Sequence, residues 1–428
     1  MARDAPPTHA AIDAVWRIEA AKIVGALARM VRDVGLAEDF AQDALESALQ
    51  HWPREGLPDN PGAWLMTAAK RRALDHLRRA SMQAERHQQL GADLRALEAD
   101  LSPDVAELVE AARDDDIGDD LLRLMFVACH PLLSTDARVA LTLKLVCGLS
   151  TPEIARAFLV PEPTIAQRIV RAKRTLSEAR VPFEVPRGDD RAQRLGSVLE
   201  AIYLVFNEGY SASAGADWTR PALCDEALRL ARVLVGLVPG DPEALGLLAL
   251  LEIQGSRLAA RIDAQGAPVL LADQDRRRWD TASIRRGLAA LDRAAAAVGG
   301  EGALGPYGLQ AAIAACHARA AAFADTDWPR IVALYDALAR RVPSPVVALN
   351  RAVAVGMAEG PAAALALVDP LRDAPALKGY PWLPSVRGDL LARLGRVDEA
   401  RAEFERAAAL TRNERDRALL GERARTGR

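Results

Sequence analysis

The chain has 428 residues, half of them apolar and 4% aromatic, with a formal net charge of −3. About 150 residues per domain predicts roughly three domains, and a composition rich in Ala, Leu and Arg favours helices. The nearly balanced charge excludes a uniformly basic nucleic-acid-binding protein, so any such site must come from a local concentration of Lys and Arg.

The first 14 residues contain no basic cluster followed by an apolar run, so they do not resemble a signal peptide. No uninterrupted apolar stretch approaches the roughly 20 residues needed to cross a bilayer. The four cysteines form no C-x-x-C pair, which argues against a zinc site and fits a reducing compartment. The sequence therefore predicts a cytoplasmic protein without a membrane partner.

Residues 12–79 are predicted to form at least three helices, because apolar residues recur at helical spacing. The first members of this apolar pattern are Ile12, Val15 and Ile18. Gly35 is expected to end one helix, and residues 53–62, rich in Pro and Gly, are expected to form an ordered loop.

The helix that begins near Trp64 carries a basic cluster. Its cationic residues are Lys70, Arg71, Arg72, Arg78 and Arg79. Such a helix can hold phosphates without reading sequence. Taken alone, the cluster is more often a generic solvated or phosphate-binding face than a promoter reader, because charge carries no base information.

The stretch from Glu98 to Asp120 contains ten acidic residues and a single base, Arg113. Self-repelling charge with few large apolar residues disfavours a packed core. The stretch is therefore predicted to be an acidic linker, followed by a second small helical block that ends near residue 180.

Residues 150–176 predict a helix-turn-helix. Ser150 or Thr151 is the expected N-cap of the first helix, and Pro152 occupies its first turn, where the missing N–H costs nothing. A tight turn at residues 160–161 leads into the second helix. The apolar face of this second helix consists of Ile165, Ile169, Ala172 and Leu176.

The opposite face of the second helix is polar and basic. It presents Thr164, Gln167, Arg168, Arg171 and Arg174, with Lys173 at the flank. Guanidinium groups can bond guanine edges or phosphates, and a glutamine amide can read adenine, so the set suits a major groove. The alternative is a solvated basic face on an ordinary surface helix. The coincidence of a capped helix, a tight turn and a basic second helix favours DNA binding.

Beyond residue 186 the chain is predicted to be a run of helices with a loose tetratricopeptide-like repeat. The clearest unit contains Gly388, Leu391, Gly395, Ala400, Phe404 and Ala407. Further helices are expected over residues 279–298, 307–323, 331–342 and 346–358. Stacked helix pairs offer a concave surface for a peptide or protein, so a protein partner on this extension is one expectation.

An enzymatic extension is one alternative. Asn207, Glu208, Tyr210 and His317 are polar candidates, but the sequence shows no nucleophile with an adjacent base, glycine-rich phosphate loop or paired-carboxylate motif. Asn207 and Glu208 are expected to cap or pin a neighbouring helix. His130 and His317 are expected to be core residues on apolar helices. The sequence thus predicts no catalytic residue, no metal and no cofactor.

Two further segments carry a family resemblance. Residues 37–44, AEDFAQDA, resemble the segment of extracytoplasmic-function (ECF) RNA polymerase sigma factors, of the sigma-70 family, that docks on the clamp helices of the polymerase beta-prime subunit. Residues 64–79, WLMTAAKRRALDHLRR, resemble the helix of the family that engages the minus-ten promoter element. Two motifs in the order found in the family are much stronger evidence for the resemblance than either motif alone.

The resemblance implies a role for each motif. It implies that Asp39, Gln42 and Asp43 bind polymerase. It implies that the minus-ten region is contacted by Trp64, Lys70, Arg71, Arg72, Arg78 and Arg79. The helix-turn-helix would read the minus-thirty-five element through Thr164, Gln167, Arg168, Arg171, Lys173 and Arg174. The chain departs from many family members in having Arg71 in place of Asn and Asp43 in place of Glu.

The implied domains are sigma region 2 over residues 10–82, the acidic linker over 83–118, region 4 over 119–182 and a tetratricopeptide-like extension over 190–428. Within region 4, residues 121–145 are expected to hold two helices with residues 136–138 between them. Residues 202–210 and 348–354 resemble segments of the subgroup whose extension is fused to the sigma factor. In that subgroup the extension is implied to be the regulator.

The sequence thus predicts an all-α sigma factor, not an enzyme, with core RNA polymerase and promoter DNA as partners. On polymerase, the resemblance implies the beta-prime clamp helices and the beta flap as contacts. The main alternative is a DNA-binding regulator with a tetratricopeptide domain that never joins polymerase. Such a regulator has no use for the docking segment or for the helix at Trp64. A pure scaffold is contradicted by both basic helices.

Overall fold

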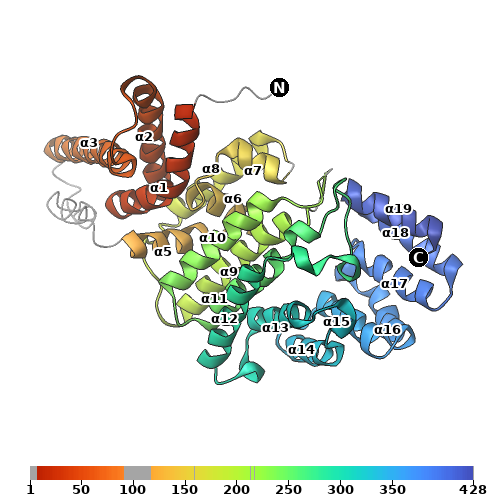
Figure 1. The fold of residues 1–428 in the computed structure, drawn as a ribbon. Coiled ribbons are helices and arrows are strands. Elements are labelled where there is room, and N and C mark those ends of the chain that lie inside the picture. The colour runs from red at the N-terminus through yellow and green to blue at the C-terminus, as the bar shows by residue number, and fades with distance from the viewer. Residues whose placement is uncertain (1–6, 91–116, 159, 213, 216, 428) are drawn as a thin grey trace. The chain divides into compact units, whose positions relative to one another are not determined.

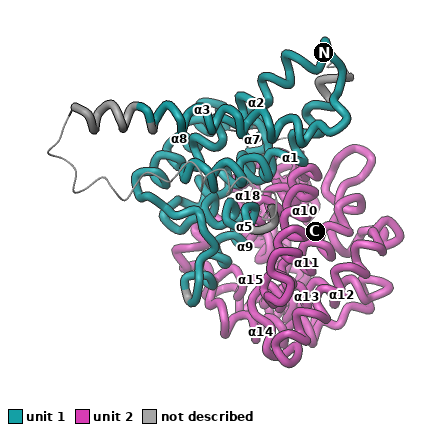
Figure 2. The backbone as a smooth tube through the Cα atoms, turned by 90° about the vertical axis from the view of Figure 1, so that its left-hand side faces the viewer, with its two compact units in different colours: residues 1–201 teal, residues 202–428 magenta. Residues whose placement is uncertain are grey.

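The computed structural model describes residues 7–90, 117–158, 160–212, 214–215 and 217–427. It forms two compact units, residues 1–201 (unit 1) and residues 202–428 (unit 2) (Figure 2). Helices dominate both units, and the strands found in the described residues are two residues long (Figure 1). The predicted all-α class is confirmed. None of the described helices is long and apolar enough to span a membrane.

Unit 1 begins with three long helices that pack on one another. They are α1 (Pro7–Val31), α2 (Val34–Glu55) and α3 (Pro61–Leu90). A stripe of small residues on α2, including Ala37, Ala41 and Ala44, is fully buried, so the helices approach closely. Trp64 lies in the first turn of α3, as expected. Ile18, expected on the apolar face of α1, is instead 65% exposed.

The expected helix end at Gly35 is wrong, because Gly35 lies in the first turn of α2. The chain turns at Arg32, whose φ of 52° is in the left-handed region. Asp33 then caps α2, and its carboxylate accepts a hydrogen bond from the Leu36 N–H at 2.9 Å. The cap therefore decides the boundary, and the glycine does not.

The expected loop at residues 53–62 is also too long. Pro53 lies inside the last turn of α2, and the Gly56 N–H still bonds to the Trp52 carbonyl at 3.0 Å. Gly56 then leaves the helix with a φ of 89°, a conformation that glycine adopts without a steric penalty. The connection to α3 is therefore only residues 56–60.

Four further helices of unit 1 form the second predicted block. They are α5 (Ile117–Ala128), α6 (Thr135–Leu145), α7 (Thr151–Phe158) and α8 (Glu162–Glu178). Residues 136–138 lie in the first turn of α6 and not between helices, because Ser134 caps α6 by accepting the Ala137 N–H at 3.4 Å. His130 lies in the segment before α6, and its expected place on an apolar helix is wrong.

Most of the predicted acidic linker, residues 91–116, lies outside the described residues. Residues 83–90 belong to α3 and not to a linker. Asp120, at the end of the acidic stretch, belongs to α5 and is buried. Its carboxylate lies 3.3 Å from Arg29 of α1 and 2.7 Å from Arg123, so this acid ties α5 to α1.

Unit 2 is a succession of helices entered through α9 (Gly188–Tyr210), which spans the boundary between the units. The longer helices are α10 (Pro221–Leu237), α11 (Pro242–Gly255), α12 (Thr281–Ala297), α13 (Pro306–Arg319), α14 (Trp328–Arg341), α15 (Pro345–Ala358), α16 (Pro361–Val368), α17 (Trp382–Arg393), α18 (Val397–Leu410) and α19 (Glu414–Thr426). Five of these begin with Pro, whose fixed φ suits the first helical position. All four helices expected between residues 279 and 358 are present.

Short 3₁₀ helices connect the longer ones. They are η2 (Leu258–Ala260), η3 (Leu271–Asp273), η4 (Arg276–Arg278), η5 (Glu301–Ala303), η6 (Phe323–Asp325), η7 (Asp369–Asp373) and η8 (Pro375–Leu377). Successive long helices pack on their neighbours, and Figure 1 follows this succession from α10 to α19. The predicted helical extension is confirmed.

The clearest predicted repeat unit is the hairpin of α17 and α18. Phe404 of α18 is fully buried against Gly388 of α17, where an added Cβ would lie only 2.8 Å from the Phe404 ring. Leu391, Ala400 and Ala407 are fully buried in the same cluster. The small residue thus sets the distance between the two helices.

The end of unit 2 contacts the beginning of the same unit. Strand β1 (Ala214–Gly215) pairs in parallel with β2 (Arg412–Asn413). The Asn413 side chain donates to the Ala212 and Asp217 carbonyls at 3.0 and 2.9 Å. The Trp218 indole N–H donates to Asp416 of α19 at 2.9 Å. Segments about 200 residues apart in sequence are therefore joined.

Candidate functional site

The helix-turn-helix in unit 1 begins with a reciprocal cap. Ser150 Oγ accepts the Glu153 N–H at 3.4 Å, while the Glu153 carboxylate accepts the Ser150 N–H at 2.8 Å and its hydroxyl at 2.7 Å. Partial burial alone would raise the pKa of Glu153, but these bonds and the Arg17 guanidinium hold that pKa below its usual value. Of the two expected N-caps, Ser150 is the one observed.

Helix α8 has one buried and one exposed face. The buried residues are Ile165, Ile169, Ala172 and Leu176, as predicted. The exposed polar residues include Thr164, Gln167, Arg171 and Arg174. Arg168 lies at one flank, 3.1 Å from Asp136 of α6. Arg174 lies 3.1 Å from Glu178, one turn along the same helix. Such surface pairs are weak, so a phosphate can replace the carboxylate.

Lys173 lies on the other flank of α8 and is directed at α2. Its side chain is only 17% exposed, and its Nζ forms an ion pair with Glu38 and lies 3.7 Å from Asp39. Lys144 of α6 lies 3.3 Å from the same Glu38. Burial alone would raise the pKa of Glu38, but the two lysines hold it below its usual value. The structure thus separates Lys173 from the exposed residues of α8.

The basic cluster of α3 is mostly exposed. Arg71, Arg72, Arg78 and Arg79 are exposed, and Lys70 is partly buried. Arg72 donates to Asp43 at 2.9 Å and to Ser47 at 2.8 Å, both on α2. Trp64 packs edge-on against Trp52, with ring centres 5.4 Å apart, so the start of α3 is held against the end of α2.

The predicted docking residues lie on α2 beside this cluster. Asp39 has a side chain that is 70% exposed, and Gln42 donates to Glu38 at 3.4 Å. Asp43 accepts the bond from Arg72. The structure therefore brings the docking residues and the basic cluster of α3 together on adjacent helices.

Glu38 is a site residue that the sequence analysis did not single out. It is buried and joins three helices through its two lysines. A signal was present, because Glu38 follows Val34 by four residues and precedes Ala41 by three, which is the spacing of the buried face of α2. An acid on an apolar face requires a partner.

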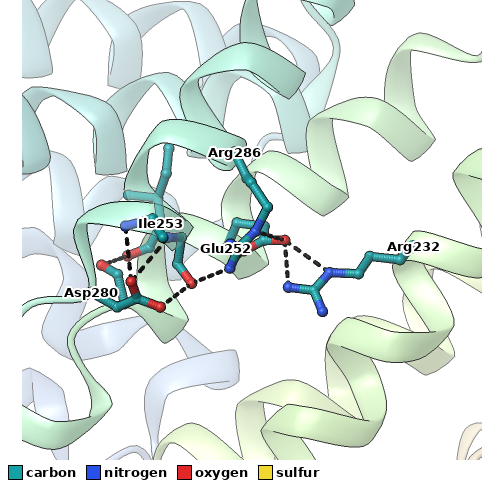
Figure 3. A network of polar contacts seen from close by, with 8 residues as sticks. Arg232, Glu252, Ile253, Asp280 and Arg286 are labelled. Carbon is teal, nitrogen blue, oxygen red and sulfur yellow. Dashed lines mark hydrogen bonds and ion pairs between the residues drawn. The ribbon is translucent and has the colours of Figure 1, made fainter.

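Buried charge in unit 2 is paired within its helices. Glu252 of α11, 2% exposed, accepts Arg232 of α10 at 2.8 Å and Arg286 of α12 at 3.1 Å (Figure 3). Arg286 also donates to Ser283, whose hydroxyl donates to Asp280 at 2.7 Å. Figure 3 shows this chain of contacts linking three successive helices. These contacts hold α10, α11 and α12 together.

Two other polar candidates of unit 2, Glu208 and His317, also have structural contacts. Glu208 forms an ion pair with Arg220, so it pins the segment after α9 as expected. His317 is partly buried on α13, beside Trp328, with ring centres 5.3 Å apart. Burial, with the charges of Arg257 and Arg276, lowers the pKa of His317 to about 4. In the described part of the chain, no three His, Cys, Asp or Glu side chains form a metal site.

Family models match three segments of the chain. Residues 17–82 match sigma-70 region 2, and residues 123–176 match sigma-70 region 4. Residues 194–295, which run from α9 into α12, match a family of unknown function, DUF6596. The first two matches contain the basic cluster of α3 and the exposed face of α8.

One curated relative extends over most of the chain, and two others match part of it. An uncharacterized protein of Rhizobium meliloti (strain 1021), R00370, is 47% identical over 93% of this chain and 91% of the relative. The probable ECF RNA polymerase sigma factor SigI of Mycobacterium tuberculosis is 32% identical over 56% of this chain and 86% of the relative. The ECF sigma factor SigK of Mycobacterium ulcerans is 29% identical over 36% of this chain and 78% of the relative. No solved structure matches the chain significantly.

Proposed function

The chain belongs to the ECF RNA polymerase sigma factors, and we propose that α3 and α8 divide promoter recognition between them. As a sigma factor, the chain binds core RNA polymerase and promoter DNA and directs transcription initiation. Sigma factors are transcription regulators, and the chemistry is performed by polymerase. A DNA-binding regulator that never joins polymerase is excluded, because residues 17–82 match region 2.

The minus-thirty-five element is assigned to α8. The observation that supports this assignment is the exposed face with Gln167, Arg171 and Arg174, which lies opposite the buried stripe of a capped helix-turn-helix. Recognition helices present such a face to the major groove. Thr164 and Arg168 complete the proposed contacts. Lys173 is bound to Glu38, so we assign it to the contact with α2 in this state.

The minus-ten region is assigned to α3. Arg71, Arg78 and Arg79 are exposed and can reach phosphates, while Lys70 and Arg72 lie closer to the helix packing. Trp64, partly exposed at the start of the helix, offers a ring on which an unpaired base can stack. Opening of promoter DNA at this element would expose such bases.

Polymerase docking is assigned to Asp39, Gln42 and Asp43. The three side chains follow one another along α2, and the exposed carboxylate of Asp39 is available to a basic partner surface. We assign this face to the beta-prime clamp helices and region 4 to the beta flap. Because polymerase works in the cytoplasm, the same proposal places the chain there.

The extension is proposed to modulate this activity, with a protein or peptide as the partner of its stacked helices. We propose that the extension spans residues 190–428. The domain limits 10–82, 83–118 and 119–182 remain proposals for the sigma regions and their linker. Supporting this division, the match to a separate family starts at residue 194.

Run-off transcription with the full chain, core polymerase and a promoter library tests the proposed function. The chain should produce transcripts from promoters that share two elements. The double variant Arg171→Ala/Arg174→Ala should lose these transcripts while still binding core polymerase. The control removes two exposed arginines of unit 2, Arg285→Ala/Arg340→Ala, and should keep them. Absence of both transcripts and core binding for the wild type would refute the proposal.

A further inference from the structure

One apolar side chain stands on the exposed face of α8. Val170 is 63% exposed. It follows Gln167 by three residues and precedes Arg174 by four, and this spacing places the three side chains on one face of the helix. The buried stripe, from Ile165 to Leu176, lies on the other side. Val170 is therefore closer to the centre of the exposed face than Lys173, which is directed at α2.

Exposure alone does not give a surface valine a role, because single apolar residues are common on protein surfaces. Leu132, in the segment before α6, is 57% exposed, for example. Val170 differs in its surroundings, which are the amide and guanidinium groups that the proposed function directs at base edges. A β-branched residue also has a lower helix propensity than Ala, Arg or Gln, so the exposed position is not explained by helix stability.

The major groove offers a matching group. Each base pair presents hydrogen-bond donors and acceptors there, and the apolar group among them is the C5-methyl of thymine. An isopropyl group inserted between polar side chains cannot hydrogen-bond, but it can bury a methyl group. Cytosine lacks the C5-methyl group, so it offers the isopropyl group no matching apolar contact.

We propose that Val170 contacts the C5-methyl group of a thymine in the upstream promoter element and so makes thymine preferred at that position. This inference rests on the proposed assignment of α8 to the minus-thirty-five element. It adds a specificity-determining residue to Gln167, Arg171 and Arg174, and it names the base that the residue selects.

The test removes single methyl groups from the DNA. In a promoter obtained from the library, each thymine of the upstream element is replaced in turn by deoxyuridine, which differs only in lacking the methyl group. Binding and run-off transcription are measured with holoenzyme assembled from the full chain. For the wild type, one replacement should weaken promoter binding about fourfold, the effect expected for one buried methyl group.

The variant Val170→Ala should bind the thymine and uracil promoters equally well at that position. It should fold normally, because Val170 is exposed and Ala is the better helix former. Leu132→Ala, at an exposed apolar side chain outside α8, serves as the control and should keep the full fourfold difference.

The outcomes separate the two proposals. If the wild type neither produces transcripts from any promoter nor binds core polymerase, the proposed function fails. If it produces transcripts but the element lacks thymine, or no uracil replacement weakens binding, the inference about Val170 is overturned. The same holds if Val170→Ala keeps the wild-type difference between thymine and uracil. Loss of that difference in Val170→Ala and not in Leu132→Ala supports it.

Discussion

At the scale of single residues, Glu38 is a buried acid of unit 1 that contacts two lysines. The carboxylate is buried between Lys144 and Lys173, both of which are also largely buried. Neither lysine could be left unpaired without a large cost, because removing one member of a buried pair leaves an uncompensated charge. Glu38 therefore stabilises the packing of α2 against α6 and α8.

Replacing Glu38 by Gln is expected to lower the free energy of unfolding by about 3 kcal/mol at pH 7. The folded-state pKa of Glu38 lies below its usual value of 4.5, so the wild-type advantage is complete above pH 4.5 and is lost as pH falls through the folded-state pKa. Urea unfolding at several pH values measures this. Glu46→Gln, at an exposed position of α2, is the matched control. Equal stability of both variants would contradict the prediction.

His317 offers a second titration. Its pKa of about 4 lies below the usual 6.5, so between these values the unfolded chain binds a proton that the folded protein excludes. Stability should therefore fall as pH is lowered from 7 to 4. In His317→Gln, the free energy of unfolding should decrease by about 2 kcal/mol less between pH 7 and pH 4 than in the wild type. Denaturant unfolding measures this decrease. His51→Gln, on the surface of α2, is the control. An unchanged pH dependence in His317→Gln would argue against a buried neutral imidazole.

At the scale of elements, helix positions follow from caps, and helix distances follow from small residues. Ser150, Ser134 and Asp33 each begin a helix by accepting a backbone N–H. Between helices, Gly388 lets α17 approach the Phe404 ring of α18, and no larger residue fits without movement.

Gly388→Ala is expected to destabilise unit 2 by about 2 kcal/mol, because the added methyl group overpacks the contact with Phe404. Gly236→Ala is the matched control. Gly236 lies in α10 with no atom within 4 Å of an added Cβ, so this substitution should be neutral or stabilising. Thermal unfolding of both variants measures the difference. A stable Gly388→Ala variant would show that the two helices can separate freely.

At the scale of the whole molecule, the first and last segments of unit 2 are bound to each other. Asn413 caps α19 and also binds the carbonyls of Ala212 and Asp217, while Asp416 accepts the Trp218 indole N–H. A run of helices that contact only their neighbours could fray from its end. This closure removes that free end.

Asn413→Ala should therefore cost more than the loss of a cap. Ser344→Ala, which removes an N-cap with no partner across the unit among the described contacts, is expected to cost about 1 kcal/mol. Asn413→Ala should cost about 1 to 2 kcal/mol more, because it also removes the donor to the carbonyls of buried Ala212 and exposed Asp217. Hydrogen exchange should become faster at residues 217–218 in Asn413→Ala alone. Equal effects of the two variants would mean that the closure adds no stability.

Local signals in the sequence were sufficient for most elements. The buried face of α8, a cap at Ser150 or Thr151 and the four helices between residues 279 and 358 depend on neighbouring residues, so the pattern along the chain predicted them. The two family motifs and the helix-turn-helix likewise led to the sigma-factor family. Errors arose where single residues were read as breakers, as at Gly35 and Pro53, because caps and side-chain packing outweigh a residue's average preference.

Tertiary structure alone decided the partners of the buried charges and the joining of distant segments. Glu38 and Lys173 are 135 residues apart, and Asn413 and Ala212 are 201 apart. No periodic pattern links positions at such separations, because periodicity reports only which face of a helix is apolar. Which faces meet depends on how whole helices pack. The sequence by itself thus determined the helices and the family, and packing determined which side chains of α8 remain exposed.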